Sequence, residues 1–310
     1  MMGGPCEIAK LIFHRVGIVL IFYSPKKFPT YANFFSLQEN AAMERPVALI
    51  TGAASGIGRH FVRSNRDRFR WAATDIQESA LLAVLGGETE HFLPLKLDVS
   101  DAQSWKVVIG ACLNKFGRID YLFNVAGVSL PRFIVDANER HIDQHLDINT
   151  KGVLYGTTQV AQVMEKQGQG HIINIASLAG IAPVPGMSYY TASKFAVRGF
   201  SLAAALELRE KNIFVTVICP DLVRTPMFEH QLTLPKESAL SFSGSTRLLS
   251  VEDVEKAIHK AIRKKPLELT LPPARGALAK IGGTFSGLAW LLYRRLYRKG
   301  LRNAEKLKNL

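Results

Sequence analysis

Three side chains in the middle of the chain have the types and spacing needed to move a proton to or from an oxygen. Tyr190 and Lys194 stand four residues apart in a run with helical periodicity, so both fall on one face of a helix. Ser177 follows an apolar segment, 171–176, that predicts a buried strand. An ammonium beside a phenol favours the phenolate and lowers its pKa. Tyr190 is therefore a candidate general acid or base, with the Ser177 hydroxyl close by.

A tyrosine–lysine pair at this spacing is more often a solvated surface pair, so the interpretation depends on the rest of the chain. Short apolar segments alternate with helical ones over residues 46–272, which is typical of a parallel sheet covered on both faces. The predicted strands are 47–50, 71–74, 92–97, 121–125, 171–176, 214–218 and 267–270. We therefore predict a single doubly wound α/β domain, whose ligands bind beyond the carboxyl ends of the strands.

A glycine-rich turn, residues 51–58, joins the first strand to a helix. Backbone N–H groups in such a turn, together with the dipole of the helix, bind a pyrophosphate well, although a lone glycine-rich turn is more often only structural. Asp75 ends the second strand 17 residues after Gly58, close to the spacing of a ribose-binding acid. Its carboxylate would repel a 2′-phosphate, so we expect NAD rather than NADP, with Arg59 as the residue that would favour the phosphate.

Together these residues resemble the short-chain dehydrogenase/reductase family in its single-domain form. The matching motifs are T-G-A-A-S-G-I-G at 51–58, Asp75, D-V at 98–99, N-V-A-G at 124–127, Asn149, Ser177 and Y-T-A-S-K at 190–194. They follow the family's order and spacing across residues 45–270. The resemblance implies a Rossmann fold and an NAD(P)-dependent oxidoreductase that interconverts a secondary alcohol and a ketone, or an alcohol and an aldehyde.

The resemblance also implies a role for each matching residue. Tyr190 would be the general acid or base, and Lys194 would lower its pKa and hold the nicotinamide ribose. Ser177 would orient the substrate oxygen, and Asn149 would position a proton-relay water. The implied cofactor-binding residues are Gly52, Ser55, Ile57, Gly58, Asp75, Asp98, Val99, Asn124, Ala126, Gly127, Tyr190, Lys194 and Thr225.

Two departures from the family pattern stand out. Asp221 follows Pro220 where the family usually has glycine, and the helical segment 59–70 is far more basic than expected. The segment 227–245, which covers the substrate in the family, mixes large apolar residues with polar ones. That mixture suggests a lipophilic alcohol or ketone, such as a steroid, a retinoid or a long-chain compound. The alternative is a lid that simply packs its apolar face on the domain.

The composition excludes several other classes of site. The net charge is +13, but residues 275–310 hold nine Lys or Arg against one acid, while 46–274 are nearly balanced. A basic nucleic-acid groove in the fold is therefore not expected. The three cysteines have no pairing or metal spacing, which favours a reducing, cytoplasmic location. His141 and His145 stand four apart without a third ligand at a useful spacing, so we expect no metal.

Both ends of the chain extend beyond the predicted domain. Residues 1–45 hold an apolar run too short to span a bilayer, and they form an anchor, a targeting segment or a stretch that precedes the true start at Met43. Residues 273–310 form a basic tail, with an amphipathic helix over 285–302. The apolar side of that helix holds Phe285, Leu288, Ala289, Leu292, Tyr293 and Leu296. Such a helix either lies on an anionic membrane surface or docks on the domain.

The sequence thus favours an NAD-dependent oxidoreductase that acts on a small alcohol or ketone and forms a homo-oligomer. One alternative is a non-catalytic dinucleotide-binding protein that senses redox state. A third reading is an interaction protein at a membrane surface. The complete Ser177, Tyr190 and Lys194 set favours the enzyme, because a binding module does not need an acid or base.

Overall fold

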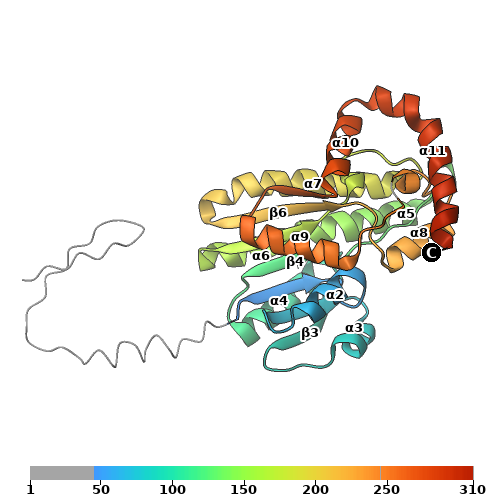
Figure 1. The fold of residues 1–310 in the computed structure, drawn as a ribbon. Helices are drawn as coiled ribbons and strands as arrows, with labels where there is room; N and C mark the ends of the chain where they lie inside the picture. The colour runs from blue at the N-terminus through green and yellow to red at the C-terminus, as the bar shows by residue number, and fades with distance from the viewer. Residues whose placement is uncertain (1–44, 245, 310) are drawn as a thin grey trace, which may run out of the picture. The chain divides into compact units, whose positions relative to one another are not determined.

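Seven parallel strands form the centre of the protein, in a computed structural model that describes residues 45–244 and 246–309 (Figure 1). Their order across the sheet is β3-β2-β1-β4-β5-β6-β7. The strands are β1 (Val47–Thr51), β2 (Arg70–Asp75), β3 (Phe92–Lys96), β4 (Tyr121–Asn124), β5 (Gly170–Ile175), β6 (Ile213–Pro220) and β7 (Glu268–Leu271). The doubly wound α/β fold predicted from the sequence is confirmed. The predicted extension lies, except for Arg45, outside the described residues.

Two layers of helices cover the sheet. The first layer holds α2 (Gly56–Ser64), α3 (Glu78–Leu85) and α9 (Val251–Lys264); the second holds α4 (Ala102–Phe116), α6 (Gly152–Gln167) and α7 (Ser188–Glu207). Strand β1 shows why both faces are apolar. Its alternate residues Ala48 and Ile50 pack on the first layer, and Val47 and Leu49 pack on the second. A strand buried on both sides must be a continuous apolar run.

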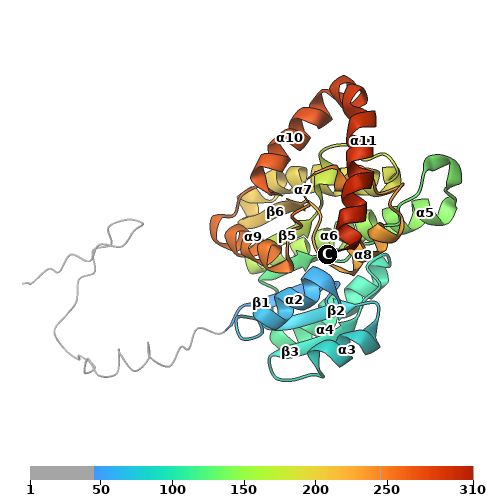
Figure 2. The same cartoon turned by 45° about the vertical axis from the view of Figure 1, so that its right-hand side comes forward.

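The sheet reverses its winding between β1 and β4, which are hydrogen-bonded neighbours although two strands separate them in the chain. The connections leave in opposite directions from this point, so a crevice opens beyond the carboxyl ends of the two strands. A short helix α5 (Glu139–Gln144) and α8 (Pro226–Thr233) lie outside the two layers, and a π-helix (His145–Lys151) leads directly into α6. Two further helices, α10 (Pro273–Thr284) and α11 (Ser286–Lys308), rise above this end of the sheet (Figure 2).

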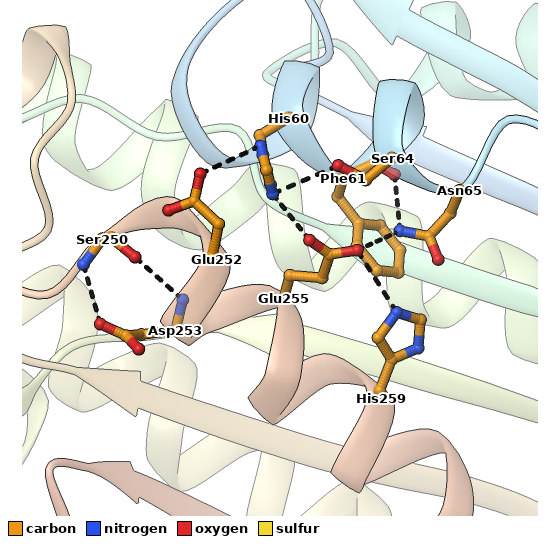
Figure 3. A network of polar contacts seen from close by, with 9 residues as sticks. All are labelled: His60, Phe61, Ser64, Asn65, Ser250, Glu252, Asp253, Glu255 and His259. Atoms are coloured by element: carbon orange, nitrogen blue, oxygen red, sulfur yellow. Dashed lines mark hydrogen bonds and ion pairs between the residues drawn. The ribbon is translucent and has the colours of Figure 1, made fainter.

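The basic helix α2 is held by an acidic partner on α9 (Figure 3). His60 Nε2 and Asn65 Nδ2 each lie 2.7 Å from a carboxylate oxygen of Glu255. Burial raises the pKa of Glu255, but these hydrogen bonds outweigh it and hold that pKa below its usual value. Phe61 and Val62 of α2 are fully buried, and the Phe61 ring lies 5.6 Å from the His259 ring of α9. The unusual polarity of this helix is thus matched across the α2–α9 contact.

A search for membrane-spanning helices over the described ranges, 45–244 and 246–309, finds no helix with the length and apolar character needed to cross a bilayer.

Candidate active site

The glycine-rich turn between β1 and α2 folds tightly against the end of β4. Gly52 has a φ of 71°, and a Cβ at this position would lie 2.9 Å from the Ala126 backbone. A Cβ on Gly58 would lie only 2.2 Å from the Gly52 carbonyl oxygen. The Thr51 hydroxyl accepts hydrogen bonds from the Val125 and Ala126 amides, which ties the two strand ends together. Only glycine at these two positions lets the turn close, with the amino end of α2 facing the crevice.

Two carboxylates stand beside this turn at the ends of β2 and β3. Asp75 accepts hydrogen bonds from the amides of Ala54 (3.0 Å) and Gln77 (3.0 Å). Asp98 accepts from the Ser100 amide and hydroxyl, at 2.9 and 2.6 Å. These bonds fix both carboxylates at the rim of the crevice. Asp75 is therefore well placed to accept further hydrogen bonds from the two hydroxyls of a ribose.

Ser177, Tyr190 and Lys194 come together where β5 ends and α7 begins. Ser177 accepts a hydrogen bond from the Ala179 amide, which orients its hydroxyl at the strand end. Tyr190 and Lys194 are almost fully buried on one face of α7. The Lys194 Nζ donates to the Ile175 carbonyl at 3.0 Å and lies 5.8 Å from the centre of the Tyr190 ring. The geometry therefore brings the predicted catalytic side chains to one place.

In the protein alone, burial has the largest effect on the pKa of Tyr190, and the predicted lowering by Lys194 stays a prediction. Burial raises the pKa of Tyr190 to about 12, and a hydrogen bond with Ser177 opposes this rise only in part. Burial also lowers the pKa of Lys194 to about 8. Desolvation penalises the charged form of each side chain. In the protein alone, Tyr190 is thus a neutral phenol, poised to donate a proton.

Asn149 lies in the π-helix and is completely buried. Its Oδ1 accepts from the Val128 amide (2.8 Å), and its Nδ2 donates to the Val128 carbonyl (2.9 Å) and to Ser193 (3.0 Å). Both protons of the amide are therefore used within the protein. Asn149 holds the loop after β4 against α7, and any contact with a relay water would have to involve an oxygen acceptor.

The side chain of Asn124 points away from the crevice, and the predicted part of Asn124 in cofactor binding stays a prediction. Alternate residues of a strand share a face, and Asn124 points, like Leu122, toward the α6 layer. Its Nδ2 donates to Asn174 at 2.8 Å and to Thr157 at 3.3 Å. Asn124 therefore cross-links the buried faces of β4, β5 and α6.

A cavity of about 1640 Å³ runs along the crevice from the glycine-rich turn to α11. The predicted residues that line it are Gly52, Ser55, Ile57, Asp75, Asp98, Val99, Ala126, Gly127, Ser177, Tyr190, Lys194 and Thr225. Thr225 caps α8 opposite the turn, within van der Waals distance of where a Gly56 side chain would lie. The cavity lining does not include Gly58, Asn124 or Asn149, which support the segments that line it. The cavity exceeds the usual size of a small-molecule site, so its volume leaves room for more than one ligand.

Sequence reasoning missed the ion pair that closes the far side of the cavity. Asp221, at the end of β6, lies 2.7 Å from Arg275 of α10, and both residues line the cavity. Burial raises the pKa of Asp221, and Arg275 acts in the opposite direction. The only sequence signal was the acid in place of the usual glycine. A partner 54 residues further along could not be identified from spacing.

Comparison with known proteins agrees with this geometry. The family model "short chain dehydrogenase" matches residues 46–234. A 3-oxoacyl-[acyl-carrier-protein] reductase of Thermotoga maritima is 34% identical over 220 residues, covering 70% of this chain and 89% of the relative. A 3-alpha-(or 20-beta)-hydroxysteroid dehydrogenase of Mycobacterium bovis is 35% identical over 182 residues, covering 58% and 70%.

The fold also matches a solved structure. A short-chain dehydrogenase/reductase from Burkholderia phymatum, in complex with NAD, superposes with a TM-score of 0.68 at 26% identity, covering 79% of this chain and 95% of that one. The chain belongs to the short-chain dehydrogenase/reductase family and is an NAD(P)-dependent oxidoreductase that acts on CH–OH groups.

Proposed function

We propose that the protein interconverts a lipophilic secondary alcohol and its ketone, or an alcohol and an aldehyde, and that it uses NAD in preference to NADP. The observation that carries the proposal is the position of Ser177, Tyr190 and Lys194. All three line one cavity, which also reaches the glycine-rich turn and Asp75. A substrate oxygen beside Ser177 and Tyr190 would thus share the cavity with the cofactor's reactive ring.

In the direction of ketone reduction, the Tyr190 phenol donates its proton to the substrate oxygen, and the Ser177 hydroxyl hydrogen-bonds the developing oxyanion. A bound nicotinamide ring supplies the hydride, or accepts it in the reverse direction. The Lys194 ammonium places a polar group at the buried end of α7. It lies near Gly127, where the nicotinamide ribose would bind. In the direction of alcohol oxidation, the positive charge of the oxidised ring would favour the Tyr190 phenolate.

The preference for NAD rests on Asp75. Its carboxylate lies at the cavity wall beside the amino end of α2. A 2′-phosphate placed there would face a like charge. Arg59, the residue that would favour a phosphate, does not line the cavity.

We expect Asp75→Asn to raise the ratio of kcat/KM for NADPH over NADH by about tenfold, which corresponds to 1.4 kcal/mol. The matched variant Glu78→Gln removes a nearby charge outside the cavity and should leave the ratio unchanged; an equal shift in both variants would contradict the role of Asp75.

The preference for a lipophilic substrate rests on the side chains beyond Tyr190. Val184, Met187, Phe228, Leu240, Leu278 and Leu296 line this part of the cavity. Apolar walls with few polar groups favour an apolar ligand that is oriented by a single oxygen. Phe228 and Phe242 also pack on α11, so the predicted lid both covers the cavity and packs on the domain.

The test is a panel of secondary alcohols and ketones of increasing length and ring number, assayed through the absorbance of the reduced cofactor. We expect kcat/KM to rise with apolar surface, by roughly three- to fourfold per added methylene at about 0.8 kcal/mol each. Cofactor binding without turnover across the panel would instead support the non-catalytic redox sensor.

The homo-oligomer and the cytoplasmic location remain predictions. Sedimentation of the full chain would measure the first, and a monomer at micromolar concentration would contradict it.

A further inference from the structure

Helix α11 is bound to the domain at one end only. In its carboxyl half, Gly300, Asn303, Ala304 and Leu307 are buried. Asn303 Nδ2 donates to the carbonyls of Phe242 (2.8 Å) and Gly244 (3.2 Å). The predicted docking of the tail on the domain therefore holds for this half, and it fixes the direction in which the rest of the helix points.

The amino half of α11 and the end of α10 form a hairpin that points away from the sheet. Both views show the α10–α11 junction as the part of this hairpin farthest from β6 and α7 (Figures 1 and 2). Large apolar side chains gather around the junction and are mostly exposed: Leu278 (67%), Ile281 (49%), Phe285 (63%), Trp290 (78%) and Leu291 (77%). We call these five residues the hairpin tip. The side chains of Leu288 and Ala289, which the sequence placed on the apolar side, lie outside the described residues.

The hairpin tip is continuous with the active-site cavity. Leu278, Ile281 and Trp290 line the cavity and are also exposed to solvent. Tyr293 and Leu296, on the following turns of α11, line the same cavity. One apolar surface therefore runs from the outside of the hairpin down to Tyr190. A lid that only shielded the reaction from water would bury such side chains rather than expose them.

Cations flank the hairpin tip. Arg294, Arg295, Arg298 and Lys299 on the next turns of α11 are all exposed. Glu305 is the only acid between residues 275 and 310. Exposed Trp, Phe and Leu next to clustered arginines match the layered chemistry of an anionic bilayer, where apolar side chains reach the acyl boundary and cations meet the headgroups. A protein partner would have to supply both an apolar socket and a ring of acids.

We propose that the hairpin tip inserts into the surface layer of an anionic lipid bilayer and opens the active-site cavity toward it. Apolar substrate then enters from the lipid along the surface of Leu278, Ile281 and Trp290. The lipid contact stands on the hairpin alone, whereas the entry route rests on the proposed function. The hairpin lies in the membrane surface and does not cross it, in agreement with the lack of a spanning helix within the described part of the chain.

Vesicle co-sedimentation of the full chain tests the lipid contact. We expect binding to vesicles of phosphatidylcholine with 30% phosphatidylserine, and at least about tenfold weaker binding to pure phosphatidylcholine or in 0.5 M salt. The variant Phe285→Ser/Leu291→Ser changes two exposed tip residues that do not line the cavity. It should weaken binding by at least about tenfold, because two large side chains lose their burial. The matched control Val107→Ser/Val135→Ser changes two exposed apolar residues elsewhere and should bind normally.

Turnover of a water-soluble ketone separates the two proposals. Equal turnover in wild type and both variants, with weak vesicle binding only in Phe285→Ser/Leu291→Ser, supports the inference. Normal turnover without any vesicle binding overturns the lipid contact and leaves the proposed function intact. No turnover in any variant, with normal vesicle binding, overturns the proposed function alone. The wild-type protein could instead form a dimer and fail to bind vesicles, with only the tip variant losing the dimer. That result would make the hairpin tip a contact between two copies of the chain and overturn the proposal.

Vesicle-delivered substrate tests the entry route. Turnover of a long-chain ketone dissolved in anionic vesicles should fall in Phe285→Ser/Leu291→Ser in proportion to lost binding. Unchanged turnover of that ketone would show that substrate enters from water and overturn the entry route.

Discussion

The two ends of the cavity are built from different parts of the molecule. At the cofactor end, the backbone forms the wall: strand ends, a glycine turn and amides that hold Asp75 and Asp98. At the substrate end, side chains from α8, α10 and α11 form it. Backbone walls need particular residues at fixed short spacings, whereas an apolar side-chain wall needs only size and hydrophobicity. The backbone wall of the cofactor end can therefore be recognised from a sequence motif, whereas the side-chain wall of the substrate end has almost no motif.

The largest expected effect is at the cofactor end. Gly58→Ala places a Cβ at 2.2 Å from the Gly52 carbonyl, so the turn must shift. We expect NADH affinity, measured by fluorescence titration, to fall by at least about 10²-fold. Gly110→Ala is the matched control, since a Cβ at Gly110 meets nothing within 4 Å. Unchanged NADH affinity in Gly58→Ala would contradict the view that the backbone wall of the cofactor end needs particular residues.

Lys194 lies between the cofactor end and the substrate end of the cavity. Burying its charged form lowers the free energy of unfolding. Because the folded pKa of Lys194 is about 8, below the usual 10.5, the cost is fully present below pH 8 and fades as the pH rises to 10.5. Lys194→Met should therefore raise the free energy of unfolding by about 1–2 kcal/mol at pH 7, less at pH 10, while turnover falls at least about 10²-fold. Urea unfolding at both pH values measures this.

Lys211→Met serves as the control for that measurement, because Lys211 lies in an exposed pair with Glu165. A Lys194→Met protein less stable than wild type at pH 7 would mean that the lysine stabilises the fold rather than serving the reaction.

A smaller effect is expected at the substrate end. Arg275→Met leaves the partly buried Asp221 without its partner and should loosen α10. We expect the substrate KM to rise about three- to tenfold, with the NADH dissociation constant changed less than about twofold. Lys280→Met, which removes an α10 cation paired with Glu268 outside the cavity, should change neither constant. Loss of NADH affinity in Arg275→Met would show that α10 also shapes the cofactor end.

The same contrast explains what the sequence could predict. Most strands were predictable because they are short, mainly apolar runs, and Asp75 because it ends such a run. The buried side of Asn124 was missed because a motif gives no direction to a side chain at a strand end. The rise in the pKa of Tyr190 could not be predicted, because spacing shows the nearby lysine but not the burial. Helix α10 and its pairing with Asp221 depend on packing between distant segments, which local periodicity does not encode.

The most direct test of the account is a comparison of binding and turnover in Tyr190→Phe, which removes only the phenolic oxygen. We expect kcat to fall at least about 10²-fold while the NADH dissociation constant stays within about threefold. Tyr189→Phe, which changes the neighbour outside the cavity, should behave as wild type. Near-normal kcat in Tyr190→Phe would contradict the assignment of Tyr190 as the group that exchanges a proton with the substrate.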